Sequence, residues 1–166
     1  MNEKELIKQQ LLDLLKHMGF DADILERQEE GRMVFNIKTQ DAQLLIGKQG
    51  ANLEALQYII RAFSRKNPES ERFPFALDVD DYKDKRVIYL KELARRAAHQ
   101  ARSSKRSVGL PLMPAFERKV VHDYLSLFAD ISSESQGMEP NRRVVIRNKK
   151  STPQQPSDDF VFIENS

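Results

Sequence analysis

DAQLLIGKQGANL, residues 41–53, is the stretch that decides the fold. It predicts a short helix, a break at Gly-Lys-Gln-Gly (47–50) and a second, longer helix. The two glycines allow the main chain to turn sharply and to approach a ligand closely. The second helix starts at the break with free amide groups and the positive end of its dipole, which favours phosphate. The break is therefore a candidate anion-binding loop.

Periodic apolar residues place further elements around this break. Helical spacing predicts one helix over 7–18 and another over 53–63. Strict alternation predicts a strand over 73–79 and a second over 33–37, with a hairpin partner in 24–30. The predicted order is helix, strand, strand, helix, Gly-Lys-Gln-Gly, helix, strand.

This order, with GxxG between two helices, resembles a type II (prokaryotic) KH domain. The segment LLIGKQGANLEALQYIIRAF, residues 44–63, is similar to the KH domain of the bacterial Jag family. The resemblance implies that Gly47, Lys48, Gln49 and Gly50 clamp about four nucleotides of single-stranded RNA or DNA. Ile46 and the first turn of the second helix would line the apolar side. A glycine-containing helix corner without a ligand is the alternative.

Charge is unevenly distributed along the chain. Residues 1–82 carry 11 basic and 15 acidic side chains, a net charge of −4, whereas residues 83–150 carry 16 basic and 7 acidic, a net charge of +9. The last 16 residues have a net charge of −3. The second half is therefore the basic module.

A long helix is predicted over residues 84–106, with an apolar face rich in alanine. An adjacent face presents a ridge without an acidic member, which makes a bound anion plausible: Lys91, Arg95, His99, Arg102 and Arg106. Because Lys and Arg are ordinary surface residues, a solvated face is the alternative.

The segment LPLMPAFERKVVHDYL, residues 110–125, predicts another helix after Pro114, with Phe116 and Val121 among the residues of its buried side. Arg118 and His122 stand four residues apart and share one face at the edge of this apolar stripe. This Arg-x-x-x-His pair, followed by SSESQGMEPNRRVVIRN at 132–148, resembles the R-3-H domain that follows KH in the Jag family.

The resemblance implies that Arg118 and His122 contact single-stranded nucleic acid. Arg can pair with phosphate or stack on a base, and His can stack or donate a hydrogen bond. A structural role, in which the pair holds neighbouring carbonyls or carboxylates, is the alternative. Glu117 is predicted near the middle of the apolar face and needs partners, such as early-helix amides or an arginine of the long helix.

The C-terminal segments complete the prediction. A strand over 142–147 puts Arg143 and Arg147 on one face, where they could extend the basic surface. The fold class is α+β, with a type II KH domain over 1–82, a small α/β R-3-H domain over 83–150 and a disordered tail over 151–166. The apolar run 160–163 leaves an edge strand or a docking segment open.

Composition excludes several classes of protein. The chain has no cysteine, so disulfides and thiolate metal sites are excluded, and no metal-ligand spacing or nucleophile motif is found. No uncharged stretch approaches the roughly 20 residues of a membrane span, and charges near the N-terminus interrupt any signal peptide. We expect a cytoplasmic protein, without direct membrane insertion, that is not an enzyme and needs no cofactor.

The resemblance covers residues 3–148 and implies a single-stranded RNA-binding protein, a post-transcriptional regulator linked to cell-envelope growth. Single-stranded DNA is a further candidate ligand, and another KH protein a candidate partner. Many Jag-type proteins carry an additional N-terminal domain, which we expect this chain to lack. The alternative function is an adaptor that uses both folds as scaffolds for protein contacts and ignores RNA.

Overall fold

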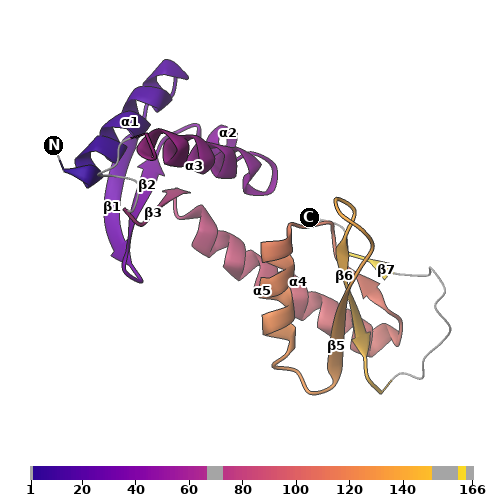
Figure 1. Ribbon diagram of the computed structural model, residues 1–166. Helices are drawn as coiled ribbons and strands as arrows, with labels where there is room; N and C mark the ends of the chain where they lie inside the picture. Colours follow the sequence, from indigo (N-terminus) through magenta and orange to yellow (C-terminus); the bar gives the residue numbers. More distant parts are fainter. Residues whose placement is uncertain (1, 67–72, 151–160, 164–166) are drawn as a thin grey trace. The chain divides into compact units, whose positions relative to one another are not determined.

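The computed structural model describes residues 2–66, 73–150 and 161–163 (Figure 1). The chain forms two compact units, residues 1–84 and 85–166. Each unit has its own hydrophobic core and its own sheet. The predicted boundary after residue 82 falls within the first turn of a helix that begins in the first unit and continues in the second.

The first unit has the predicted order of elements. They are α1 (Glu3–His17), β1 (Asp23–Glu29), β2 (Arg32–Lys38), α2 (Ala42–Ile46), the 3-10 turn η1 (Lys48–Gly50), α3 (Ala51–Ser64) and β3 (Phe75–Val79). β1 and β2 form an antiparallel hairpin, while β2 pairs in parallel with β3. A parallel pair needs a crossover, and α2, η1 and α3 supply it. The glycine break therefore lies in the crossover.

The three helices cover one face of the first sheet (Figure 1). Alternate residues of β2 and β3, among them Phe35 and Leu77, point into a core with the apolar stripe of α1, which includes Leu11. At the free edge of β3, the side chain of Gln57 accepts a hydrogen bond from the Leu77 amide at 2.6 Å. α3 is thereby fixed against the strand that closes the sheet.

A polar network fixes the chain where β3 leads into the next helix. Asp78 is fully buried, and its Oδ1 accepts hydrogen bonds from the amides of Val79 and Lys83. Arg27 of β1 donates to Asp78 at 3.2 Å and to Asp81 at 2.5 Å. A buried carboxylate requires such partners. The network therefore ties the end of the first sheet to the start of the helix that follows.

The second unit contains a four-stranded sheet and two helices. The elements are α4 (Tyr82–Ser104), β4 (Val108–Gly109), α5 (Ala115–Leu125), β5 (Ile131–Gln136), β6 (Arg143–Asn148) and β7 (Val161–Phe162). The strand order is β5-β6-β4-β7. β7 is the edge strand that the sequence left open for the C-terminal segment. Residues 151–160 and 164–166 of the predicted tail lie outside the described residues.

Small residues pack the second core closely. The alanine face of α4 is fully buried together with Val121 and Leu125 of α5 and Val144 and Ile146 of β6. The prediction for Phe116 is wrong, because its side chain is 68% exposed. The buried side of α5 instead includes Glu117 and Arg118, so the helix is rotated relative to the predicted apolar stripe.

Candidate nucleic-acid interface

The backbone of the Gly47–Gly50 loop adopts positive φ angles, which cost conformational energy for residues other than glycine. Gly47 has φ 69° and ψ −176°, Gln49 has φ 55° and Gly50 has φ 85°. Three of four successive residues thus have a positive φ, a region that L side chains rarely occupy. The amide of Gly47 donates to the backbone carbonyl of Gln43 at 2.9 Å, which closes α2. The sequence GKQG therefore specifies a tight connection between two helices.

A side chain at either glycine would also crowd a neighbouring residue. A Cβ on Gly47 would lie 2.5 Å from Cγ of Asn52, whose Nδ2 donates to the Leu44 carbonyl at 2.8 Å. A Cβ on Gly50 would lie 3.1 Å from Cε1 of Tyr82. Asn52 thus ties α3 back to α2, and the Tyr82 ring supports the loop from the start of α4.

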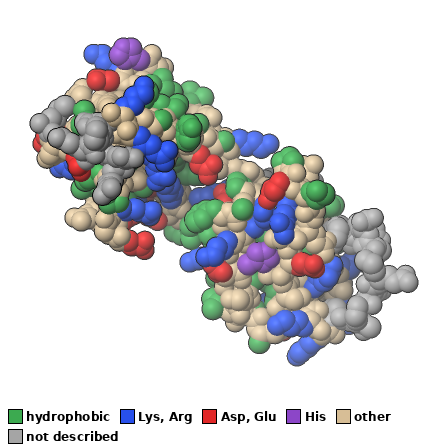
Figure 2. Space-filling view, in the orientation of Figure 1, with side chains coloured by type: hydrophobic (Ala, Val, Ile, Leu, Met, Phe, Trp, Pro, Cys, Tyr) green, Lys and Arg blue, Asp and Glu red, His purple; other side chains and the backbone are tan. Residues whose placement is uncertain are grey.

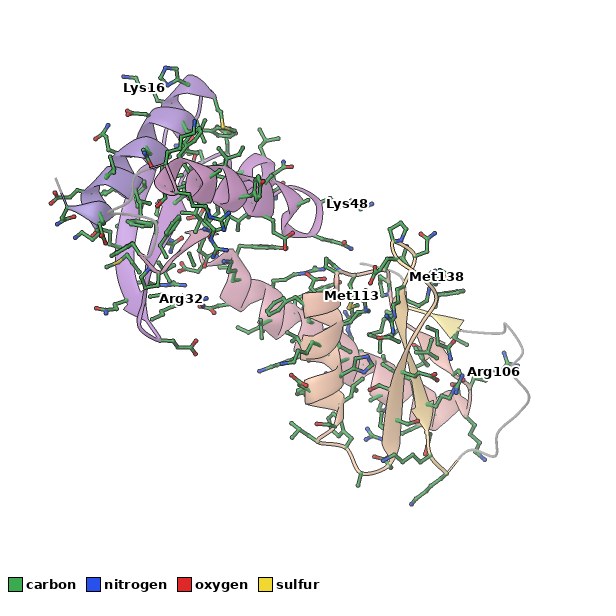
Figure 3. The ribbon with its side chains drawn as sticks, viewed as in Figure 1. Lys16, Arg32, Lys48, Arg106, Met113 and Met138 are labelled. Atoms are coloured by element: carbon green, nitrogen blue, oxygen red, sulfur yellow. The ribbon has the colours of Figure 1, made fainter. Side chains whose placement is uncertain are left out.

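This packing places a cation at the tip of the loop. Lys48 is exposed, whereas Ile46 and Gln49 are half-buried and Ile46 packs against the core (Figure 3). The 14-residue α3 begins directly after Gly50. The loop therefore combines an exposed ammonium group with the positive end of a helix dipole, as an anion site requires.

Arg118 lies in the second unit, and its guanidinium group already has protein partners. The residue is 5% exposed, its Nη1 donates to the Met113 carbonyl at 2.9 Å and its Nη2 donates to the carboxylate of Glu139. Arg118 thereby joins the start of α5 to the β5–β6 loop. Direct contact with nucleic acid would require the Arg118 guanidinium group to exchange these partners.

His122 lies one turn further along α5 and is held between two serines. Its Nδ1 is 2.7 Å from Ser133 Oγ and its Nε2 is 2.8 Å from Ser135 Oγ. Burial lowers the pKa of His122 from 6.5, and the positive charges of Arg118 and Arg142 lower it further. His122 is therefore neutral at pH 7, with the ring fixed against β5.

The sequence analysis did not identify the two serine partners of His122. Ser133 and Ser135 are two residues apart in β5 and share the face that contains Ile131, which is buried in the core. Their spacing of two residues along a strand was the sequence signal that could have placed both on the face that meets His122.

The prediction that Glu117 needs an arginine from the long helix is confirmed. Arg86 of α4 donates hydrogen bonds to the two carboxylate oxygens of Glu117 at 2.7 and 2.9 Å.

The predicted basic ridge of α4 is not free of acidic partners. Arg95 forms two hydrogen bonds with Glu92, and Arg102 forms two with Asp130, which lower the pKa of Asp130 to about 2. The helix ends at Ser104, so Arg106 lies beyond the ridge (Figure 3). His99 is exposed. Two of the five ridge residues are thus paired with carboxylates that lie outside the ridge, and binding of an anion by the ridge stays a prediction.

The two arginines predicted on one face of β6 do share that face. Arg147 donates to Ser107 Oγ at 3.1 Å and lies 3.7 Å from a carboxylate oxygen of Glu134. The guanidinium carbon of Arg143 lies 5.0 Å from the centre of the Phe162 ring. Figure 2 shows acidic side chains dispersed among the basic ones on the face in view.

The described residues contain neither a membrane-spanning helix nor a cluster of metal ligands. No helix among them is long and apolar enough to cross a membrane. In the same residues, no three His, Asp or Glu side chains are grouped to hold a metal ion.

Comparison with known proteins assigns both units. Residues 4–74 match the family model for the KhpA/KhpB KH domain, and residues 89–148 match the model for the R-3-H domain. The chain is 31% identical over 153 residues to the RNA-binding protein KhpB of Clostridium symbiosum, covering 89% of this chain and 68% of that protein.

Two further relatives carry the same name. The KhpB proteins of Bacillus subtilis and Lactiplantibacillus plantarum are 33% and 34% identical, over 78% and 84% of this chain. The chain spans 62% and 43% of their lengths. The Jag-type resemblance of the sequence is thus confirmed in both units, and the chain belongs to the KhpB family of KH and R-3-H domain proteins.

Proposed function

We propose that this chain binds single-stranded RNA, with the Gly47–Gly50 loop as the clamp on the RNA backbone. The observation that carries the proposal is the loop itself, whose glycines bring main chain, Lys48 and the start of α3 to one exposed point. KH domains clamp nucleic-acid backbones with a loop of this sequence pattern. The relatives' name, RNA-binding protein, supports the same ligand.

The R-3-H unit adds a second contact region in this proposal. Arg118 is expected to act mainly by fixing the start of α5 against the β5–β6 loop, and His122 by fixing α5 against β5, since both already have partners. Phosphate contacts would then fall to exposed cations near them, such as Lys119 and Arg142. Binding needs no chemistry and no cofactor. We place the function in the cytoplasm, as post-transcriptional regulation linked to cell-envelope growth, with single-stranded DNA as a weaker ligand.

The test is the double substitution Lys48→Asp with Gln49→Asp in the full chain. Two carboxylates at the exposed loop would repel phosphate, so we expect at least a hundredfold loss of affinity for a labelled random-sequence 12-nucleotide RNA. The matched control is Lys16→Asp with Gln9→Asp on the exposed side of α1, which makes the same change in charge. Equal RNA affinity of the two folded variants would contradict the clamp assignment.

We also propose a protein partner at the outer side of α3. Tyr58, Ile59 and Phe63 are exposed there at helical spacing and form an apolar stripe with Ala55 and Ala62. Another KH protein is the candidate, since helices commonly pair through such stripes. Ile59→Asp should abolish the association of this chain with itself or with another KH protein, measured by light scattering. RNA binding by the Gly47–Gly50 loop should be unchanged.

A further inference from the structure

The sheet of the second unit has a second face, opposite the core with α4 and α5, where the central residue Val145 is 1% exposed. Val144 and Ile146 of β6 point into the core formed with α4 and α5. Arg143, Val145 and Arg147 alternate with them and therefore lie on the opposite face. We call this opposite side the outer face; from β5 to β7 it includes Glu134, Arg143, Val145, Arg147, Gly109 and Phe162.

An exposed aromatic ring and a guanidinium group meet on the outer face. Phe162 of β7 is 54% exposed, and Arg143 Cζ lies 5.0 Å from its ring centre. Since β4 lies between β6 and β7, the Arg143 side chain reaches across two strand spacings, about 9 to 10 Å. Gly109 makes this possible, because it is in register with Phe162 and has no side chain.

The charges around the ring favour an anionic ligand. Among the described residues Arg143 forms no ion pair, and its guanidinium group lies over the Phe162 ring. Arg147 Nη1 lies 3.7 Å from a carboxylate oxygen of Glu134, a distance at which an exposed ion pair contributes little. Arginine beside an exposed aromatic ring is the combination with which proteins hold single-stranded nucleic acid, by stacking a base and neutralising its phosphate.

We propose that the outer face is a second RNA-contact site, in which a nucleobase stacks on Phe162 and Arg143 neutralises the adjacent phosphate. The site rests on the proposed RNA binding of the chain. It is separate from Arg118 and His122, because Ser133 and Ser135, the partners of His122, lie on the helix-covered face of the sheet. β7 also lies outside residues 89–148, which match the R-3-H domain.

Phe162→Leu and Phe162→Trp in the full chain separate stacking from packing. Leu keeps an apolar side chain but has no π face, so it should weaken binding of a labelled 12-nucleotide single-stranded RNA by roughly 5- to 150-fold. Trp should bind within about twofold of the wild-type chain. Phe116→Leu is the matched control, since it removes an exposed ring of the same unit, on α5, and should leave affinity unchanged.

Salt dependence assigns the second residue of the site. Arg143→Gln should reduce the slope of log affinity against log salt by about 0.7, the amount expected for one phosphate contact on a single strand. Phe162→Leu should lower affinity at every salt concentration without changing this slope. Photocrosslinking to 5-bromouridine RNA should give an adduct at Phe162 that the Leu variant lacks.

Several outcomes would overturn the proposal. Wild-type affinity of a folded Phe162→Leu variant would exclude stacking, and equal losses for Leu and Trp would show a packing role. If Phe162→Leu instead weakened binding of an octaglutamate peptide and spared RNA, the outer face would be a protein-binding surface. A wild-type chain without RNA affinity would refute the proposed function as well, which distinguishes the two failures.

Discussion

The Gly47–Gly50 loop and the Arg118–His122 pair show two ways in which a short motif specifies structure. In the loop, positive φ values and close contacts with Asn52 and Tyr82 fix the backbone, and the Lys48 side chain stays exposed. In the pair, the helix backbone is ordinary and the side chains are fixed by partners on other elements. Stability should therefore depend on backbone in the first motif and on side chains in the second.

The largest effect on stability is expected from Gly47→Ala. The new Cβ would displace Asn52 from its hydrogen bond with Leu44 and would occupy a conformation that favours glycine. Strain and crowding together should lower the free energy of unfolding by about 3 kcal/mol, measured by urea titration. Gly31→Ala is the control, because Gly31 has φ 78° with open space around it, and should cost about 1 kcal/mol. Equal costs would show that Asn52 adds no constraint.

Arg118→Ala should have the next largest effect. It would leave the buried Met113 carbonyl without its partner, and we expect a loss of about 2 kcal/mol in the free energy of unfolding. Lys119→Ala, one residue further on and exposed, is the control and should change stability by less than about 0.5 kcal/mol. If the Arg118→Ala variant were as stable as wild type but bound RNA weakly, the result would indicate that Arg118 contacts RNA directly.

A smaller effect is expected from the protonation of His122. Its pKa is lower in the folded chain than the ordinary 6.5, so the unfolded chain takes up the proton first as the pH falls. Stability from the neutral ring is therefore complete above pH 6.5 and is lost as the pH falls through the folded pKa. Unfolding titrations of wild type and His122→Gln should converge in acid. Parallel curves between pH 7 and 5 would contradict the lowered pKa.

Lys48→Ala should leave stability unchanged. Lys48 is exposed and the loop backbone is fixed without it, so the melting temperature should stay within about 1 °C. The salt slope of RNA binding should nevertheless fall by about 0.7, the value for one phosphate contact. An unaltered slope, with a normal melting temperature, would show that Lys48 does not contact phosphate. Main-chain amides of the loop would then be the remaining groups that bind the RNA backbone.

The same contrast explains what the sequence could predict. The crossover of the first sheet follows from local signals, because glycine spacing and alternation are properties of neighbouring residues. The burial of Arg118 and the exposure of Phe116 depend on how α5 is rotated against β5 and α4, which no local pattern encodes. The pairing of Arg102 could not be predicted for the same reason, since its partner Asp130 lies in the turn before β5, 28 residues along the chain.

One helix serves both units, with a practical consequence for dissecting the protein. Tyr82 belongs to the first core and touches the site of Gly50, whereas Leu90 and the alanines after it belong to the second core. A protease cut or truncation just after Val79 would spare every strand of the KH unit yet remove the ring beneath its clamp. Fragments chosen by sequence homology alone, ending at residue 74, would omit β3 as well, so their failure to bind RNA would say nothing about the intact loop.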